Sequence, residues 1–160
     1  MIHSHIDPAV DRKWMAIAIE EAHKAAKIGE IPVGAVLIQG DQLIARAHNR
    51  RELDQSPISH AEILVLEQGA KKLNRWRLGD CTLYVTLEPC PMCAGAIVMA
   101  RLGRLVYGAP DHKSGAVESL FNIPSHPCLN HQVATTSMVE ETACREILQN
   151  FFHQQRQSPP

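Results

Sequence analysis

The chain has 160 residues, 45% of them hydrophobic and 21% charged, a composition typical of a globular protein that buries a core without disulfide staples. With 16 basic and 17 acidic residues, the chain lacks the strong excess of positive charge found in many nucleic-acid-binding proteins. A local basic face could still bind a nucleic acid. No apolar run approaches the ~20 residues of a membrane span, and Met1 to Asp7 has histidines where a signal peptide has an apolar core, so we expect neither membrane insertion nor export.

Hydrophobic periodicity predicts a first helix over Pro8–Ile28, which Gly29 ends. Two short strands follow, at Val33–Ile38 and Gln42–Ala47. The turn residues Gly40-Asp41 between them indicate a hairpin.

A polar loop then leads to a second predicted helix over His60–Leu73. Ser59 is placed to be its N-cap, and Glu62 suits the acidic position of a capping box. Cys81–Leu87 is the clearest strand in the chain. Pro91–Arg101 follows it as a third helix, with a proline in its first turn.

The remaining predicted elements are a strand at Arg104–Tyr107, a strand at His131–Thr136 and a last helix over Val139–Gln154. The segment Asn122–Asn130 contains two prolines, and we expect it to lack regular secondary structure. Strands that alternate with helices indicate an α/β domain with a mixed sheet, and the length fits a single domain over residues 1–160.

Two short motifs place metal-binding side chains at the starts of two predicted helices. His60-Ala61-Glu62 offers an imidazole, and Cys90 and Cys93 offer two thiols one βα unit later. The amides and dipole of a helix N-terminus stabilise thiolates there. Catalytic zinc sites use three protein ligands and leave the fourth position to water, whereas structural sites close all four. The sequence therefore predicts a zinc site with an open position.

Such a site suits hydrolysis of an amino group on an electron-poor ring. Zinc lowers the pKa of bound water from ~16 to about 7 and so provides a nucleophile at neutral pH. The ring nitrogen and the leaving amine must each gain a proton. Glu62, two residues from the imidazole ligand, is the candidate that carries both.

Taken alone, each motif has a plainer interpretation. A Cys-x-x-Cys pair also occurs in redox proteins and structural zinc fingers, and His-x-Glu arises freely at helix starts. Cys128 is the residue that a closed structural zinc would recruit, while Cys81 and Cys144 fit as buried thiols. The odd total of five cysteines favours a reducing compartment, for which the cytoplasm is the simplest choice.

Basic residues also gather in two places, which we interpret as solvated helix ends and turns. They are Lys71, Lys72, Arg75 and Arg77, and then Arg46, His48, Arg50 and Arg51.

The paired motifs carry a family resemblance, because His-x-Glu with Pro-Cys-x-x-Cys is the signature of zinc nucleobase deaminases. The chain resembles the cytidine deaminase superfamily and, within it, the bacterial tRNA-specific adenosine deaminases, which form inosine at the anticodon wobble position. The blocks that carry this likeness, within about residues 14–152, are Ile31–Val36, Asn49-Arg50, His60–Ile63, Leu87–Ile97, Tyr107–Ala116, Leu129–His131 and Phe151-Phe152.

The resemblance implies a three-layer cytidine deaminase-like fold, with a mixed five-stranded sheet flanked by helices, and a homodimer with its sites near the interface. It implies one Zn²⁺ per subunit, with Glu62 as the proton carrier. The implied zinc ligands are His60, Cys90 and Cys93.

It further implies that Asn49 reads the purine, although asparagine is also a common turn residue. Asp111 and Lys113 would meet the RNA beside the target base. The tail after Phe152 is less basic than is usual in the family, which reduces the expected phosphate contacts from that end.

Three functions remain open on this basis. The first is deamination of adenosine at position 34 of a tRNA anticodon loop. The second is deamination of a free base, guanine or cytosine, by the same fold. The third is a non-catalytic RNA-binding module with a structural zinc, which requires a fourth protein ligand.

Overall fold

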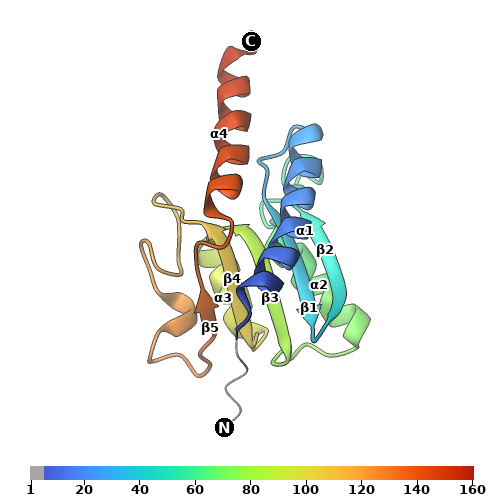
Figure 1. Ribbon diagram of the computed structural model, residues 1–160, viewed down its shortest axis with the longest axis vertical. Helices are drawn as coiled ribbons and strands as arrows, with labels where there is room; N and C mark the ends of the chain where they lie inside the picture. Colours follow the sequence, from blue (N-terminus) through green and yellow to red (C-terminus); the bar gives the residue numbers. More distant parts are fainter. Residues whose placement is uncertain (1–5) are drawn as a thin grey trace.

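The computed structural model describes residues 6–160 (Figure 1). Its elements are, in chain order, α1 (Pro8–Lys27), β1 (Gly34–Gln39), β2 (Gln42–His48), α2 (Ala61–Leu73), β3 (Cys81–Leu87), α3 (Pro91–Met99), β4 (Arg104–Ala109), a short 3₁₀ helix (Ile123–Ser125), β5 (Ala134–Thr136) and α4 (Glu141–Gln157). The predicted helices and strands are confirmed, with shifts of their ends. The last strand is shorter than predicted, because only Ala134–Thr136 of the predicted His131–Thr136 pairs with the sheet, and α4 begins two residues and ends three residues later than predicted.

The strands form one mixed five-stranded sheet in the order β2-β1-β3-β4-β5. β1 is antiparallel to both β2 and β3, and β4 is parallel to both β3 and β5. Parallel neighbours need a crossover, which α3 supplies between β3 and β4. This order brings the carboxyl ends of β2, β3 and β4 to one edge of the sheet, beside the start of β1.

Helices cover both faces of the sheet, which gives the three layers predicted from the family resemblance. α1 and α4 pack on one face, and α2 packs on the other, where it contacts α3 (Figure 1). Side chains of β1 alternate between the layers, as in any strand buried on both faces. Val36 and Ile38 join the core under α1, whereas Ala35 and Leu37 join the core under α2.

The helix ends follow from local chemistry. The Asp7 carboxylate accepts a hydrogen bond from the Ala9 N–H at the start of α1, and Gly29 just past its end has a φ of +79°, which favours glycine. For α2 the predicted capping box is wrong. His60, not Ser59, is the N-cap, and no side chain caps the helix. No helix within residues 6–160 combines the length and the apolar character that crossing a bilayer requires.

Candidate metal centre and its cavity

Two helix starts meet at the edge where the strands end. His60 is the N-cap of α2, Cys90 is the N-cap of α3, and Cys93 lies one turn into α3. The His60 Nδ1 atom lies 3.7 Å from Cys90 Sγ and 3.5 Å from Cys93 Sγ. In a tetrahedral zinc site, bonds of about 2.0 Å to nitrogen and 2.3 Å to sulfur place the nitrogen and the sulfur about 3.5 Å apart. The distances from His60 Nδ1 to the two sulfurs therefore suit a shared metal ion, and we call His60, Cys90 and Cys93 the metal corner.

Within residues 6–160, the metal corner is the group of histidine, cysteine and acidic side chains close enough to share an ion, and it contains three members. Cys128 is exposed and lies outside it. Cys81 begins β3 and so lies at the far end of the strand from Cys90. The arrangement matches a site that leaves one coordination position to a small molecule.

The side chains of the metal corner are electrostatically coupled. A hydrogen bond from Cys93, supported by one from His60, lowers the pKa of the Cys90 thiol to about 4 against the opposing effect of burial. The hydrogen bond with Cys90 raises the pKa of the Cys93 thiol, and burial raises it as well. The hydrogen bond to Cys90 also raises the pKa of His60. A thiolate is the form of cysteine that binds metals, so Cys90 is prepared for a cation.

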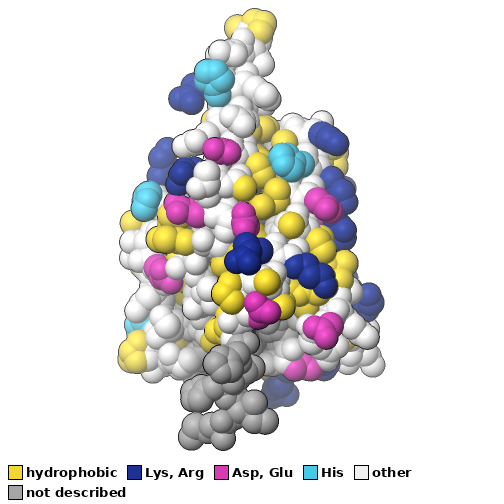
Figure 2. Space-filling model, in the orientation of Figure 1, with side chains coloured by type: hydrophobic (Ala, Val, Ile, Leu, Met, Phe, Trp, Pro, Cys, Tyr) yellow, Lys and Arg dark blue, Asp and Glu magenta, His cyan; other side chains and the backbone are white. Residues whose placement is uncertain are grey.

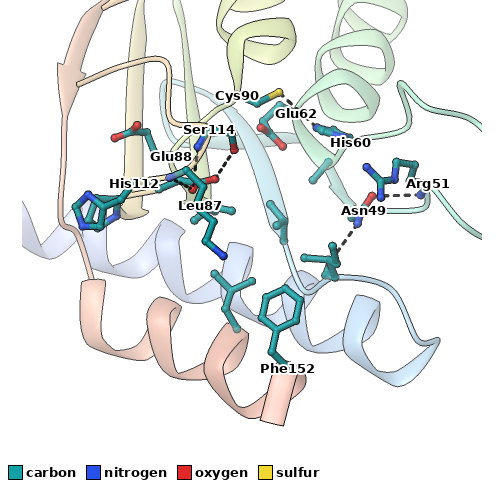
Figure 3. Close-up of a pocket in the computed structure, with 17 residues that line it drawn as sticks. Asn49, Arg51, His60, Glu62, Leu87, Glu88, Cys90, His112, Ser114 and Phe152 are labelled. Carbon is teal, nitrogen blue, oxygen red and sulfur yellow. Dashed lines mark hydrogen bonds between the residues drawn. The ribbon is translucent and has the colours of Figure 1, made fainter. Parts of the chain in front are cut away.

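Glu62 lies beside the metal corner, in the first turn of α2. Its side chain is buried, and it lines the cavity described below (Figure 3). Burial raises the pKa of its carboxyl group, against the smaller effects of a backbone hydrogen bond and of the nearby His60 charge. A carboxyl group whose pKa lies above the usual range can both take up and release a proton closer to neutral pH.

A cavity of about 500 Å³ opens at this edge of the sheet. Binding pockets for small molecules typically measure ~300–1,000 Å³, so a nucleobase fits. Of the seven predicted site residues, all but the buried Cys93 line it. Its apolar wall consists of Ile31, Val33, Ala61, Leu87, Pro110, Leu148 and Phe152.

Asn49 directly follows β2, and its side-chain amide is fixed by two hydrogen bonds. Its Nδ2 donates to the Ile31 carbonyl oxygen at 3.2 Å, and its Oδ1 accepts from the Arg51 N–H at 3.2 Å (Figure 3). An amide can make more bonds than these, so one N–H and one lone pair remain for a ligand. The contact with Arg51 is that of a turn residue, and it holds the amide at the cavity wall.

Asp111 and Lys113 differ in what their side chains do. The Asp111 carboxylate accepts hydrogen bonds from the N–H groups of Lys113 and Ser114 and from the Ser114 hydroxyl, which closes its own loop. The Lys113 ammonium is exposed and makes no ion pair within residues 6–160. Asp111 therefore shapes the loop, and Lys113 is the cation that the loop presents.

Among the cavity residues that the sequence did not predict as site residues, three show why. Arg51 follows Asn49 by two positions and was interpreted as a solvated turn residue. Glu88 lies between the predicted strand Cys81–Leu87 and the cysteine motif, and no sequence pattern assigns it a role. Phe152 comes from α4, and no spacing in the sequence indicates its proximity to His60.

The sheet order, the helix layers and the metal corner together define a nucleobase deaminase of the cytidine deaminase-like fold. The chain matches the family model of MafB19-like deaminases over residues 10–156. It is 49% identical to the tRNA-specific adenosine deaminase of Bacillus subtilis over 91% of each chain. It is 45% identical to that of Haemophilus influenzae over 92% of this chain and 86% of the relative.

Solved structures agree with this comparison. A structure from a study of A-to-I editing by tRNA:A34 deaminases superposes with a TM-score of 0.82 at 43% identity, over 85% of this chain and 99% of the other. Guanine deaminase from Nitrosomonas europaea shares the fold, with a TM-score of 0.73 at 24% identity, over 88% of this chain and 83% of the other. The chain therefore belongs to the MafB19-like deaminase family and, with its curated relatives, to the tRNA-specific adenosine deaminases.

Proposed function

We propose that the protein is a zinc-dependent hydrolase that converts adenosine to inosine at position 34, the wobble position, of tRNA anticodons. The observation that carries the proposal is the buried Glu62 carboxyl beside three convergent metal ligands, at the wall of a cavity that fits a purine. The relatives, which are tRNA-specific adenosine deaminases, support the choice of substrate.

The reaction replaces the C6 amino group of adenine by oxygen, consumes one water molecule and releases ammonia. His60, Cys90 and Cys93 would hold the zinc ion, which when bound supplies a water molecule acidic enough to react at neutral pH. Two protons must move, one to the ring nitrogen N1 and one to the leaving amine. Glu62 is the carrier of both, since its raised pKa suits proton exchange in each direction.

The cavity walls position the base for this step. The fixed amide of Asn49 offers one donor and one acceptor to the polar edge of the purine. Leu87 and Phe152 belong to the apolar wall that contacts the ring faces and excludes water. A wobble base lies in an anticodon loop, where it is unpaired, so its transfer into such a cavity costs little unstacking energy.

A second hollow extends from the cavity along α4, and it supports a polymeric substrate. Lys113, Leu148 and Phe152 line both spaces, and Arg145 and Arg156 line the second one alone. Cations beside a substrate cavity are suited to the phosphates of neighbouring nucleotides. Figure 2 shows that charges of both signs are interspersed over the face formed by α1 and α4, so the expected phosphate contacts are few and local.

The assembly and location belong to the same proposal. Leu53, Ile58 and Met99 each expose more than half of their surface, at 57%, 54% and 69%, and a second copy of the chain would cover them. We therefore propose a homodimer, which sedimentation at several concentrations tests. The five cysteines are all unpaired, which fits the cytoplasm, where tRNA is found.

The test is an inosine assay on a tRNA transcript whose anticodon begins with adenosine. We expect inosine at that position, and none when the same transcript has guanosine there. Free guanine, cytosine and adenosine are assayed in parallel. Turnover of a free base with no inosine in any tRNA would replace the proposed substrate by a free base and leave the metal site standing. A zinc ion saturated by four protein ligands would contradict hydrolysis itself.

A further inference from the structure

Glu88 is a buried carboxylate that the proposed reaction does not use. Only 2% of the residue is exposed, and no cationic side chain within residues 6–160 forms an ion pair with it. Burial of a carboxylate without a cation costs free energy. Proteins keep such groups mainly where a site requires them. The contacts of Glu88 indicate what is required here.

Both carboxylate oxygens of Glu88 accept hydrogen bonds from one distant residue. The Ser119 hydroxyl donates to Oε1 at 2.8 Å, and the Ser119 N–H donates to Oε2 at 3.4 Å. Any side chain at Gly115 would overlap the same carboxylate, so glycine is needed there for the approach. The carboxylate thus lies against the loop Pro110–Leu120 and binds both the hydroxyl and the backbone N–H of Ser119.

The backbone around Glu88 ties the loop a second time. The Glu88 N–H donates to the Ala109 carbonyl at 2.8 Å, and the Pro89 carbonyl accepts from the Ala116 N–H at 2.8 Å. Cys90, the N-cap of α3 and a member of the metal corner, follows immediately. One short segment therefore connects the loop to the metal corner.

The same loop supplies one wall of the cavity. Asp111, His112, Lys113 and Ser114 all line it, as Figure 3 shows for the labelled members. A shift of the loop would move the Lys113 ammonium relative to the metal corner. We propose that Glu88 is a positioning residue that holds the Pro110–Leu120 loop in place and thereby sets the affinity for RNA. This inference rests on the proposed tRNA substrate.

A catalytic use of Glu88 fits the geometry less well. Its oxygens are both engaged by Ser119, whereas a proton carrier needs a free oxygen towards the substrate. In Figure 3 its carboxylate points away from that of Glu62. The distinction can be measured, because loss of positioning raises KM, whereas loss of a proton carrier lowers kcat.

The test uses Glu88→Gln, Ser119→Ala and the double variant. Glutamine keeps the size of Glu88 but has one acceptor oxygen in place of two. Ser119 does not line the cavity, so its hydroxyl affects the substrate only through Glu88 and the loop. Ser125→Ala is the matched control, since the Ser125 hydroxyl makes no hydrogen bond within the described part of the chain.

We expect each single variant to raise KM for the tRNA about tenfold, the order set by one hydrogen bond to a charged group. The double variant should resemble the singles, because both changes remove one interaction. kcat and zinc content should stay close to those of the native chain. The amides of residues 110–120 should exchange hydrogen faster in both variants and not in the control.

The inference would be overturned by an unchanged KM, by additive effects in the double variant, by loss of zinc, or by a fall in kcat with a changed pH–rate profile. Unchanged hydrogen exchange in the loop would do so independently of any substrate. Failure of the proposed function is a separate result, since it would appear as a native enzyme that forms no inosine.

Discussion

Two buried polar clusters of this protein differ in how they satisfy their charges. The first joins α1 to the sheet. Arg104 donates to both carboxylate oxygens of Asp11, at 2.8 and 2.7 Å, and the Tyr84 hydroxyl donates to one of them at 2.8 Å. Burial alone would raise the pKa of Asp11, but these hydrogen bonds outweigh it and hold the pKa below its usual range. Apart from Arg104 Nε, the polar atoms of this cluster find their partners within the protein.

The second cluster is the metal corner with Glu62. No cationic side chain within residues 6–160 forms an ion pair with the Glu62 carboxyl group. Burial raises the pKa of Glu62, whereas hydrogen bonds lower the pKa of Asp11. The groups of this second cluster contact one another, and all but the buried Cys93 also face a cavity. A cluster that is closed within the protein contributes to stability, whereas one whose groups face a cavity is available for a ligand. Changes in the two clusters should therefore have opposite signatures.

The largest effect is expected from Glu62→Gln. The amide cannot carry protons, so kcat for inosine formation should fall about 10²- to 10⁴-fold, the range typical of a general acid–base residue. Zinc content should be retained, and the melting temperature should not fall, because the change removes a buried ionisable group. Glu67→Gln, an exposed residue on the same helix, is the control and should leave both properties unchanged. Near-native turnover by Glu62→Gln would remove this residue from the mechanism.

Arg104→Met should show the opposite signature. It leaves the Asp11 carboxylate buried without its cation, which costs about 3–5 kcal/mol of unfolding free energy. Turnover per folded molecule should be unchanged, since neither residue lines the cavity. Urea unfolding measures the loss, with Arg12→Met on the exposed side of α1 as a control near zero. Adding Asp11→Asn should recover part of the stability; no recovery would mean that the ion pair is not the cause.

The pH dependence of stability extends the comparison to Glu21, another self-satisfied carboxylate. Burial acts to raise the pKa of Glu21. Hydrogen bonds from His48, Lys24 and Arg46 outweigh burial and lower the pKa to about 2, from an ordinary value of 4.5. A carboxylate whose pKa is lowered by folding stabilises the protein above pH 4.5, and this stabilisation is lost as the pH falls towards 2. For Glu21 the lost free energy of unfolding is about 3 kcal/mol. Denaturation measured between pH 6 and pH 2 should show this loss in the native chain and not in Glu21→Gln. Parallel curves for the two proteins would contradict the assignment.

The metal corner could be predicted from the sequence because its chemistry is local. His60 and Cys90 each precede a helix that its own residues specify, and Cys93 follows within one turn. The cap of α2 was predicted wrongly for the same physical reason. His60 takes the extended conformation of an N-cap, with φ −75° and ψ 150°, and its ring turns to the cysteines, so Ser59 does not start the helix. N-cap propensity alone therefore does not show that a residue at the helix start serves as a metal ligand instead of a capping side chain.

Long-range contacts account for what the sequence did not reveal. β5 is short because the residues before it are bonded elsewhere: His131 Nε2 lies 2.7 Å from the Leu102 carbonyl, and the Val133 N–H donates to the Pro124 carbonyl. Phe152 reaches the cavity only through the packing of α4 against the sheet. The role inferred for Glu88 likewise depends on Ser119, which lies 31 positions later in the chain. Such contacts have no periodic signal.

The smallest effect is expected from Cys128→Ser. Comparison with Cys93→Ser tests whether the zinc ion keeps one coordination position free of protein ligands. Cys128 is exposed and outside the metal corner, so its substitution should change stability by no more than about 0.5 kcal/mol and leave one zinc per chain. Cys93→Ser should reduce both zinc content and inosine formation, because serine replaces a thiolate ligand. Zinc content measured by atomic emission tests both. Loss of zinc from Cys128→Ser would make the site a closed four-ligand centre, with no position for reacting water.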